Sequence, residues 1–316
     1  MILLKNLFLA TATHQRYFVG QESSAKNWHV LLYGLEPEIT PIRFTSGLSI
    51  RKLDLPLTVF DLAAVGASGF PAWAILEPFV MGCTCEIVSP EVRSDLPGFD
   101  ALNRAWLLSA LITLRGFGKH ISLACSRYSW NIVAGRQEGA TSRSALPPFE
   151  GDLLDYHLEL LNERYSQAGC FTKDDALWVD RYFDSFNNVA AESEKFHFAL
   201  EASIDWRYAK NPRIAISRIW GGLESIFGVN AELVYRISLM AASLLSPRGP
   251  QRKEKFEMIK EIYSNRSKAV HGEPLEDAVL LQAMEDSYHL LRDLLLLIVE
   301  KGRPLTRADF DDAIFF

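Results

Sequence analysis

The segment Glu261–Gly272 combines side-chain types that bind phosphate and transfer protons. Ile259, Ile262 and Val270 recur every three to four residues, and Arg266 falls in register with them. This period predicts a helix with Arg266 near the edge of its buried stripe. A guanidinium placed there needs a partner, because burying an unpaired charge is costly. A phosphate oxygen is one such partner and a carboxylate is another.

A histidine, His271, follows Arg266 five positions later and precedes Gly272, which is expected to end the helix. The negative end of a helix favours protonated imidazole, whereas a nearby arginine disfavours it. These opposing effects could leave His271 able to take up and release a proton near neutral pH. The segment therefore combines a side chain that could bind an anion with one that could carry a proton.

The residues Arg266-Ser267-Lys268-Ala269-Val270-His271 resemble the motif of HEPN domains. That motif is an arginine, a polar residue, three further residues and a histidine near the end of a penultimate helix. The context is similar to the ApeA-type branch of bacterial anti-phage proteins, and roughly residues 173 to 301 carry it. The segments that carry this similarity are Leu223-Glu224-Ser225-Ile226-Phe227, then Ile237 to Leu245, then Ile262-Tyr263-Ser264-Asn265-Arg266-Ser267.

The resemblance implies a metal-independent endoribonuclease in an all-α HEPN bundle. The ribose 2′-hydroxyl would attack the neighbouring phosphorus, leaving a cyclic phosphate and a free 5′-hydroxyl. His271 would act as general base or acid, and Arg266 would stabilise charge on the phosphate oxygens. The resemblance also implies a homodimer in which two motifs face one cleft, and a defence or toxin-type role.

Four further residues support this candidate site. Ser267 fills the polar position after Arg266 and would orient the pair. Glu224 would pair with Arg266 or hold His271 in position, and a purely structural ion pair is equally compatible with the pattern. Asn265 and Tyr263 flank the motif, and Tyr263 is read either as a core aromatic or as a platform for a base.

Basic residues around the motif predict where RNA, tRNA included, would bind despite a formal net charge of −6. We expect RNA contacts from Lys268, Lys260, Arg252 and Lys253. A second basic stretch contains Arg207, Lys210, Arg213 and Arg218. The alternative is that these charges are solvated helix faces.

Two other functions remain open from the sequence. A non-catalytic HEPN module would bind RNA or mediate assembly, with Arg266 paired structurally and His271 capping helix carbonyls. A ligand-sensing partner of a separate enzyme would instead show an apolar pocket in residues 1–133. In the catalytic hypothesis, that amino-terminal part would either sense an unknown activator or position the substrate.

The elements expected to position these residues form an α+β domain over 1–133, a linker over 134–151 and an all-α domain over 152–316. Gly135, Gly139, Pro147, Pro148 and Gly151 mark the linker. Strands are predicted at Trp28 to Tyr33, at Ile42 to Ile50, within Trp73 to Val88 and near His120 to Ala124, with a helix at Leu102 to Leu114.

After the linker the pattern predicts successive helices, delimited by prolines, glycines and capping residues. Thr172 and Asp175 suggest a capping box, and Asn230 is the expected N-cap of the fourth helix. The predicted ranges are Ala176 to Val189, Ser193 to Ala209, Arg213 to Phe227, Ala231 to Leu245, Phe256 to Val270 and Leu275 to Lys301.

Composition excludes several classes of protein. Cys83, Cys85, Cys125 and Cys170 are too few and too scattered for a disulfide scaffold or a zinc cage, so we expect reduced thiols and a cytoplasmic protein. We expect no metal and no cofactor, because His197 and His289 lack further ligands at useful spacing and no phosphate-binding glycine loop is present. The apolar run Leu294 to Val299 is too short to cross a membrane.

Overall fold

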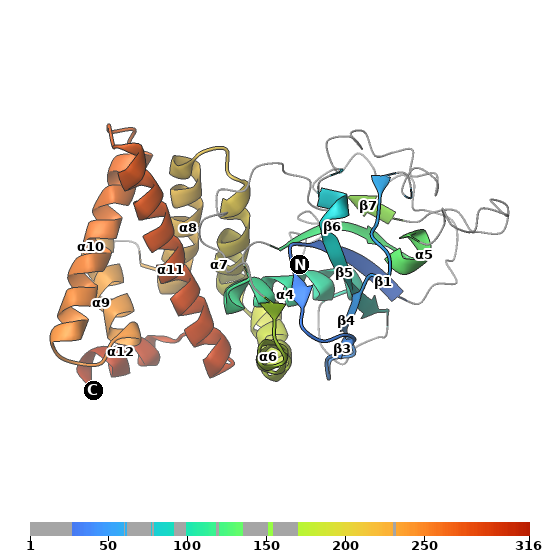
Figure 1. Cartoon of the computed structure of the whole chain (residues 1–316). Helices are drawn as coiled ribbons and strands as arrows, with labels where there is room; N and C mark the ends of the chain where they lie inside the picture. The colour runs from blue at the N-terminus through green and yellow to red at the C-terminus, as the bar shows by residue number, and fades with distance from the viewer. Residues whose placement is uncertain are drawn as a thin grey trace, which may run out of the picture. The chain divides into compact units, whose positions relative to one another are not determined.

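The computed structural model describes residues 27–59, 61, 77, 79–91, 99–117, 120–134, 151–153, 170–229 and 232–316. The chain divides into two compact units (Figure 1). We call them the sheet unit, which runs as far as Asp184, and the helical unit, which holds Ser185 to Phe316. The order of an α+β part followed by a helical part agrees with the expectation from sequence.

The sheet unit is built on a six-stranded sheet of order β3-β4-β5-β1-β6-β7, and a separate parallel pair joins β2 to β8. β1 lies at the centre and runs antiparallel to both β5 and β6. The strands are β1 (Asn27–Tyr33), β2 (Glu36–Pro37), β3 (Ile42–Arg43), β4 (Ser49–Lys52), β5 (Cys83–Pro90), β6 (Ile121–Ser126), β7 (Gly151–Leu153) and β8 (Cys170–Phe171).

The predicted strand Ile42 to Ile50 is wrong, because that segment folds into the hairpin of β3 and β4. Ile42 pairs with Ile50, and Gly47 in the turn has φ of +86°. That backbone conformation suits glycine, since other residues adopt it at a cost. The strand predicted near His120 to Ala124 is present as β6, and Trp28 to Tyr33 lies within β1.

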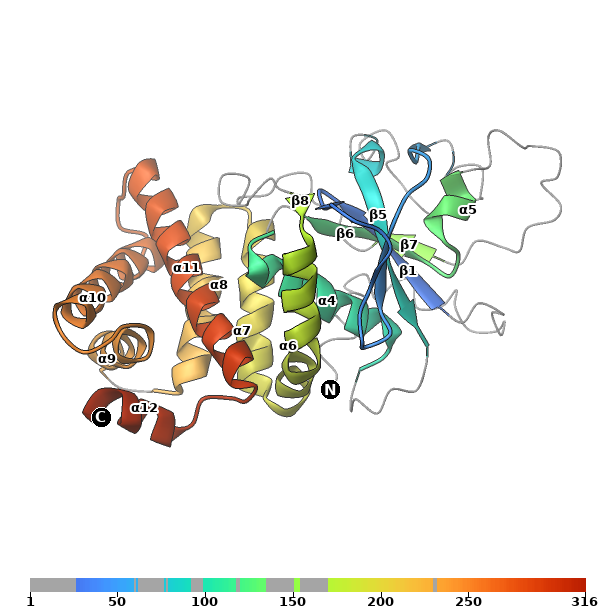
Figure 2. The same ribbon diagram turned by 60° about the horizontal axis from the view of Figure 1, so that its bottom comes forward.

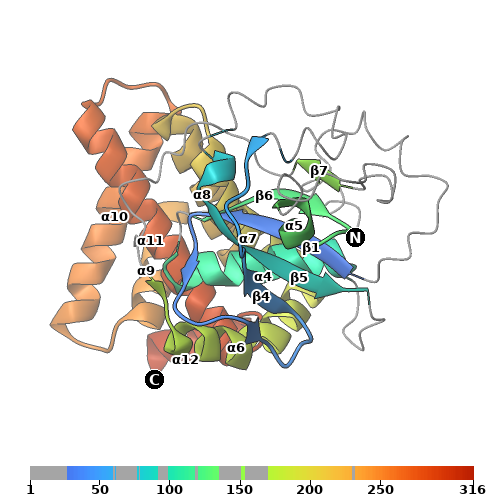
Figure 3. The same ribbon diagram turned by 45° about the vertical axis from the view of Figure 1, so that its right-hand side comes forward.

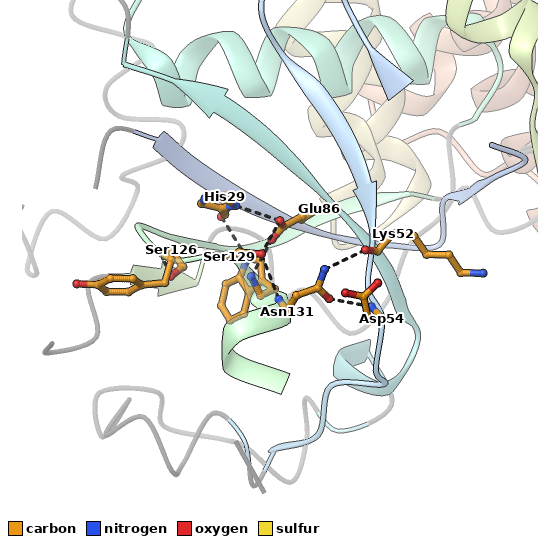
Figure 4. Close-up of polar contacts among 9 residues, drawn as sticks. His29, Lys52, Asp54, Glu86, Ser126, Ser129 and Asn131 are labelled. Atoms are coloured by element: carbon orange, nitrogen blue, oxygen red, sulfur yellow. Dashed lines mark hydrogen bonds and ion pairs between the residues drawn. The ribbon is translucent and has the colours of Figure 1, made fainter. Parts of the chain in front are cut away.

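One face of the sheet packs on the helix α4 (Ala101–Arg115), which contacts β5, β1 and β6 (Figure 3). Ser89 of β5 donates a hydrogen bond to the carbonyl of Ala101 at 2.7 Å. Successive strand side chains alternate between faces, so Glu86 of β5 points to the other face, toward the short helix α5 (Trp130–Ala134) (Figure 4). The predicted helix Leu102 to Leu114 is confirmed as α4.

The unit boundary differs from the predicted one. The sheet unit extends through the first part of α6 (Lys173–Glu192), and the division falls between Asp184 and Ser185. Most of the linker predicted at 134–151 lies outside the described residues, and its last residue, Gly151, begins β7. The Thr172–Asp175 capping box is confirmed, because each backbone N–H is bonded to the other side chain, at 3.1 and 3.2 Å.

Seven α-helices, counting the end of α6, make up the described part of the helical unit. α11 crosses α7 and α8 (Figure 2). After α6 the elements are α7 (Glu194–Asp205), the 3-10 helix η1 (Trp206–Tyr208), α8 (Pro212–Phe227), α9 (Leu233–Leu245), α10 (Pro250–Val270), α11 (Asp277–Lys301) and α12 (Arg307–Phe315).

The helix ends follow local chemistry in several places. Ser193 and Asn211 accept hydrogen bonds from the first turns of α7 and α8, and Pro212 occupies the first position of α8. Gly228 and Gly302 end α8 and α11 with φ of +60° and +65°. The predicted N-cap Asn230 lies outside the described residues, and α9 begins at Leu233.

Two predictions for the end of the chain are corrected, the start of one helix and the number of helices that follow it. α10 begins at Pro250, six residues earlier than predicted, because Pro250 opens the helix and is not part of a turn. The helix α12 was not predicted, so the Arg266–His271 motif does not end a penultimate helix: both α11 and α12 follow it.

α12 is held by its aspartate, Asp309. Arg303 donates two hydrogen bonds to the two carboxylate oxygens at 2.7 Å, and Thr306 completes a capping box with the same side chain. The guanidinium of Arg303 beside it holds the pKa of Asp309 well below its usual range. Arg252 and Arg248 donate to the carbonyls at the other end of the helix, at 2.8 and 2.7 Å.

α8 passes close to α7 and α11 at Gly222. A Cβ at Gly222 would lie 2.8 Å from the Cβ of Ala202 and 3.3 Å from the Cα of Ala199. At the neighbouring Gly221 the nearest atom would be a ring carbon of Phe198 at 3.6 Å. Gly222 therefore allows the close helix packing, whereas a Cβ at Gly221 would make only an ordinary van der Waals contact.

Candidate functional site

Arg266 lies on α10 near the buried residues Ile259, Ile262 and Ala269 and is itself half-buried, with a side chain that is 19% exposed. Val270, which was predicted to continue the buried stripe, is 43% exposed and does not continue it.

The guanidinium of Arg266 is only partly satisfied. Nη2 donates to Oε1 of Glu224 on α8 at 2.9 Å. The guanidinium carbon lies 5.4 Å from the centre of the Tyr263 ring, within cation–π range. Nε is buried and has no hydrogen-bond partner among the described residues. Of the two partners predicted for Glu224, the one it contacts is Arg266.

Aromatic packing fixes the α10 backbone at this point. The ring of Tyr263 meets the buried ring of Trp220 edge to face at 5.0 Å. The indole N–H of Trp220 donates to Ser287 Oγ on α11 at 2.9 Å. Tyr263 is therefore a core aromatic: its side chain is buried and packs on Trp220 of α8, which in turn bonds to α11.

His271 forms the C-cap of α10, and its backbone N–H donates to the carbonyl of Ser267 at 3.0 Å. The chain then turns at Gly272 with φ of +74°. The imidazole is exposed and makes no hydrogen bond or ion pair with any described residue. Nothing intramolecular therefore occupies this side chain, which leaves it free to act on a ligand.

Arg266 and His271 do not contact each other in the described structure. Five residues at roughly 100° each place His271 about 140° around the helix axis from Arg266. The motif by itself thus presents one side chain to the helix bundle and the other to solvent.

Arg213, at the start of α8, contacts the turn that carries His271. Nη1 donates to the carbonyl of Ala269 and Nη2 to that of Glu273, both at 2.8 Å. The sequence named Arg213 only as part of a basic stretch. Its contact with the turn could not be predicted, because its partners lie 56 and 60 residues away and no local sequence pattern encodes such a contact.

The remaining residues of the predicted site differ in how far their side chains are exposed to solvent. Ser267 and Asn265 are half-buried, whereas Lys268 and Lys253 are exposed. Lys260 pairs with Glu257 at 3.0 Å.

Arg252 donates to the carbonyls of Ser246 and Ala313, at 3.1 and 2.8 Å. Its guanidinium therefore has a structural task that connects the ends of α9 and α12. Of the four residues predicted to bind RNA, Lys253 and Lys268 have the most exposed side chains.

A second polar cluster lies in the sheet unit, where an activator was expected to act (Figure 4). The fully buried carboxylate of Glu86 accepts hydrogen bonds from His29 Nδ1, Ser129 Oγ and the Trp130 N–H, at 3.1, 2.9 and 2.7 Å. Asn131 bonds to the backbone of Lys52 and Asp54 beside it. The cluster anchors α5 on the sheet. The hydroxyl of Ser129 donates to the Glu86 carboxylate and not to His29, so the two side chains are not arranged as a serine nucleophile with a histidine base.

Two further features, a metal site and a membrane-spanning helix, are absent from the described residues. No group of three or more His, Cys, Asp and Glu side chains there is arranged to hold a metal ion. No described helix combines the length and apolar character needed to span a membrane.

Comparison of the chain with protein-family models, with curated proteins and with solved structures gave no match.

Proposed function

We propose that the helical unit is a HEPN-type endoribonuclease that cleaves RNA without a metal ion, acts as a homodimer and serves as a defence or toxin-type effector. The observation that carries the proposal is the exposed, unoccupied imidazole of His271 at the end of α10, five residues after a partly satisfied arginine. The sheet unit would then receive the activating signal.

In the proposed reaction His271 removes the proton of a ribose 2′-hydroxyl. The 2′-oxygen bonds to the adjacent phosphorus, the bond from phosphorus to the 5′-oxygen breaks, and that oxygen takes up a proton. The products are a 2′,3′-cyclic phosphate and a 5′-hydroxyl end. General acid–base catalysis of this kind contributes roughly 10²- to 10⁴-fold.

Arg266 would stabilise the charge that develops on the non-bridging phosphate oxygens. Its pairing with Glu224 at 2.9 Å orients the guanidinium, and the 19% of the side chain that is exposed is the part a phosphate could reach. Lys268 and Lys253 are exposed along the same helix and would attract the RNA backbone.

A homodimer belongs to this proposal because Arg266 and His271 point about 140° apart around α10. A cleft assembled from two copies would allow the arginine of one copy and the histidine of the other to reach one phosphate. The dimer therefore supplies a geometry that a single helix does not.

A second candidate is a non-catalytic module that binds RNA or mediates assembly. It is favoured by the environment of Arg266, whose side chain is 19% exposed and contacts both Glu224 and the ring of Tyr263. In that case the arginine joins α8 to α10 and has no part in a reaction.

Cleavage of total RNA and tRNA in EDTA tests the proposal. Wild type is compared with His271→Ala and Arg266→Ala, and His289→Ala is the control, because His289 is another half-exposed histidine on the adjacent helix α11. We expect a loss of about 10²-fold or more in the two motif variants and wild-type rates in the control. Circular dichroism verifies that each variant is folded, and product ends are checked for cyclic phosphate.

Undiminished cleavage by folded His271→Ala would refute the assignment of the base. A folded wild type that binds RNA without cutting it would favour the second candidate. In that event, binding that survives Arg266→Ala would further show that the arginine is structural.

A further inference from the structure

The turn after α10 has little packing of its own. Residues 270 to 274 are all exposed, and a Cβ placed on Gly272 would meet no atom within 4 Å. The backbone bonds that close it are those of His271 to Ser267, Gly272 to Ala269 and Glu273 to Lys268, at 3.0, 3.4 and 3.0 Å. An exposed turn of this kind opens readily, because exposed backbone hydrogen bonds exchange easily with water.

One side chain bridges this turn from outside. The guanidinium of Arg213 donates to the carbonyls of Ala269 and Glu273, which lie on either side of His271. Among the described residues no other side chain hydrogen-bonds to the backbone of 269–273. Because the guanidinium is planar and rigid, two bonds from it fix the separation and orientation of the two carbonyls.

The start of α8 holds Arg213 in place. Asn211 caps the helix by accepting a hydrogen bond from the Ile214 N–H at 3.1 Å, and Pro212 sets the backbone of the first turn. The same helix carries Glu224, the partner of Arg266. α8 therefore contacts both ends of the Arg266–His271 motif, one through a carboxylate and the other through a guanidinium.

We infer that Arg213 is a positioning residue for His271, which fixes the imidazole relative to the end of α10 without touching RNA. This inference rests on the proposed function. It predicts that loss of the bridge lowers the rate of the chemical step while RNA binding is retained. A misplacement of about 1 Å in a catalytic group can cost about 10²-fold in rate.

The variant Arg213→Lys tests the inference, because an ammonium keeps the charge but does not reproduce the two-pronged geometry. Arg248→Lys is the matched control: Arg248 lies in the same unit and donates to one carbonyl, that of Ile314, at 2.7 Å. For Arg213→Lys we expect kcat to fall about 10- to 100-fold with nearly unchanged affinity for a non-cleavable 2′-deoxy RNA. Arg248→Lys should behave as wild type in both measurements.

A double-mutant cycle separates positioning from direct phosphate binding. In a His271→Ala background, Arg213→Lys should cause no further loss of rate, because the group it positions is absent. A full additional loss in that background, or weaker binding of the 2′-deoxy RNA, would overturn the inference.

Hydrogen exchange provides a readout that does not depend on cleavage. Arg213→Lys should accelerate exchange of the Gly272 and Glu273 amides, and Arg248→Lys should not. Unchanged exchange in Arg213→Lys would overturn the inference even if RNA is cleaved. If the wild type does not cleave RNA, the proposed function fails and the catalytic role of Arg213 fails with it. Exchange then decides only whether the bridge holds the turn.

Discussion

The adjacent glycines of α8 are predicted to respond in opposite directions to the same substitution. Replacing a glycine by alanine inside a helix favours folding by roughly 0.5–1 kcal/mol, because glycine loses more backbone freedom on folding. Gly221→Ala should realise this gain, since its new Cβ would lie 3.6 Å from the Phe198 ring, an ordinary van der Waals distance.

Gly222→Ala has the same backbone gain and an added packing cost. Its Cβ would lie 2.8 Å from the Cβ of Ala202 and 3.3 Å from both the Cα of Ala199 and Cδ2 of Leu291. Two of these atoms are fixed by the α7 backbone, so the helices must separate. Overpacking of a core typically costs about 1–3 kcal/mol, and we expect a net destabilisation of about 1–2 kcal/mol.

Urea unfolding followed by far-ultraviolet circular dichroism measures both variants against wild type. The difference between the two free energies of unfolding cancels the backbone term and isolates the packing cost, about 1–3 kcal/mol. The slopes of the transitions should match, so that the midpoints report stability alone. If Gly222→Ala is as stable as Gly221→Ala, the close approach of α7 and α8 described above is incorrect.

Three further predictions concern other parts of the chain. Asp309→Asn should lower stability at neutral pH by about 1–2 kcal/mol, measured by urea unfolding. Because Arg303 depresses the pKa of Asp309, the wild type should lose this contribution as the pH falls below about 4, and a variant with unchanged acid sensitivity would contradict the role given to the pair. Glu86→Ala leaves three donors without their buried acceptor and should cost about 3 kcal/mol or more, whereas thermal unfolding at the wild-type temperature would show that the cluster contributes nothing. Cys170 is exposed, and burial raises the pKa of Cys85 to about 12, so mass spectrometry after native alkylation should find Cys170 labelled first; equal labelling of both would refute the burial of Cys85.

Local signals in the sequence were sufficient for most helices. Asn211 with Pro212 specifies the start of α8, and Gly228 and Gly302 specify the ends of α8 and α11. The start of α10 was misjudged because Pro250 is compatible with a turn as well as with a first helical position.

Elements that depend on distant contacts were harder to predict. α12 is a nine-residue helix whose support comes from Arg303 and from two arginines of an earlier segment, and none of these contacts leaves a periodic pattern. The hairpin of β3 and β4 was predicted as a single strand, because both strands are very short and their pairing, Ile42 with Ile50, is a contact that the sequence does not display.

In the candidate site, too, the local features could be predicted from the sequence and the long-range contact could not. The spacing of Arg266 and His271 is local, so the sequence alone suffices to propose the motif, and the predicted contact of Glu224 with Arg266 is present. Arg213 could not be identified in this way, because a bond across 56 residues depends on how two helices pack.

The central place of β1 has a consequence for the order of events during synthesis. Its first partner strand, β5, ends at Pro90, and its second, β6, ends at Ser126, roughly 90 residues after Tyr33. At roughly 5–20 residues per second, translation leaves β1 without its full set of neighbours for about 5–20 s. Until β6 is made, the nascent chain cannot complete the burial of Val30, Leu31 and Leu32, so we expect β1 to be a segment that a chaperone protects before the sheet closes.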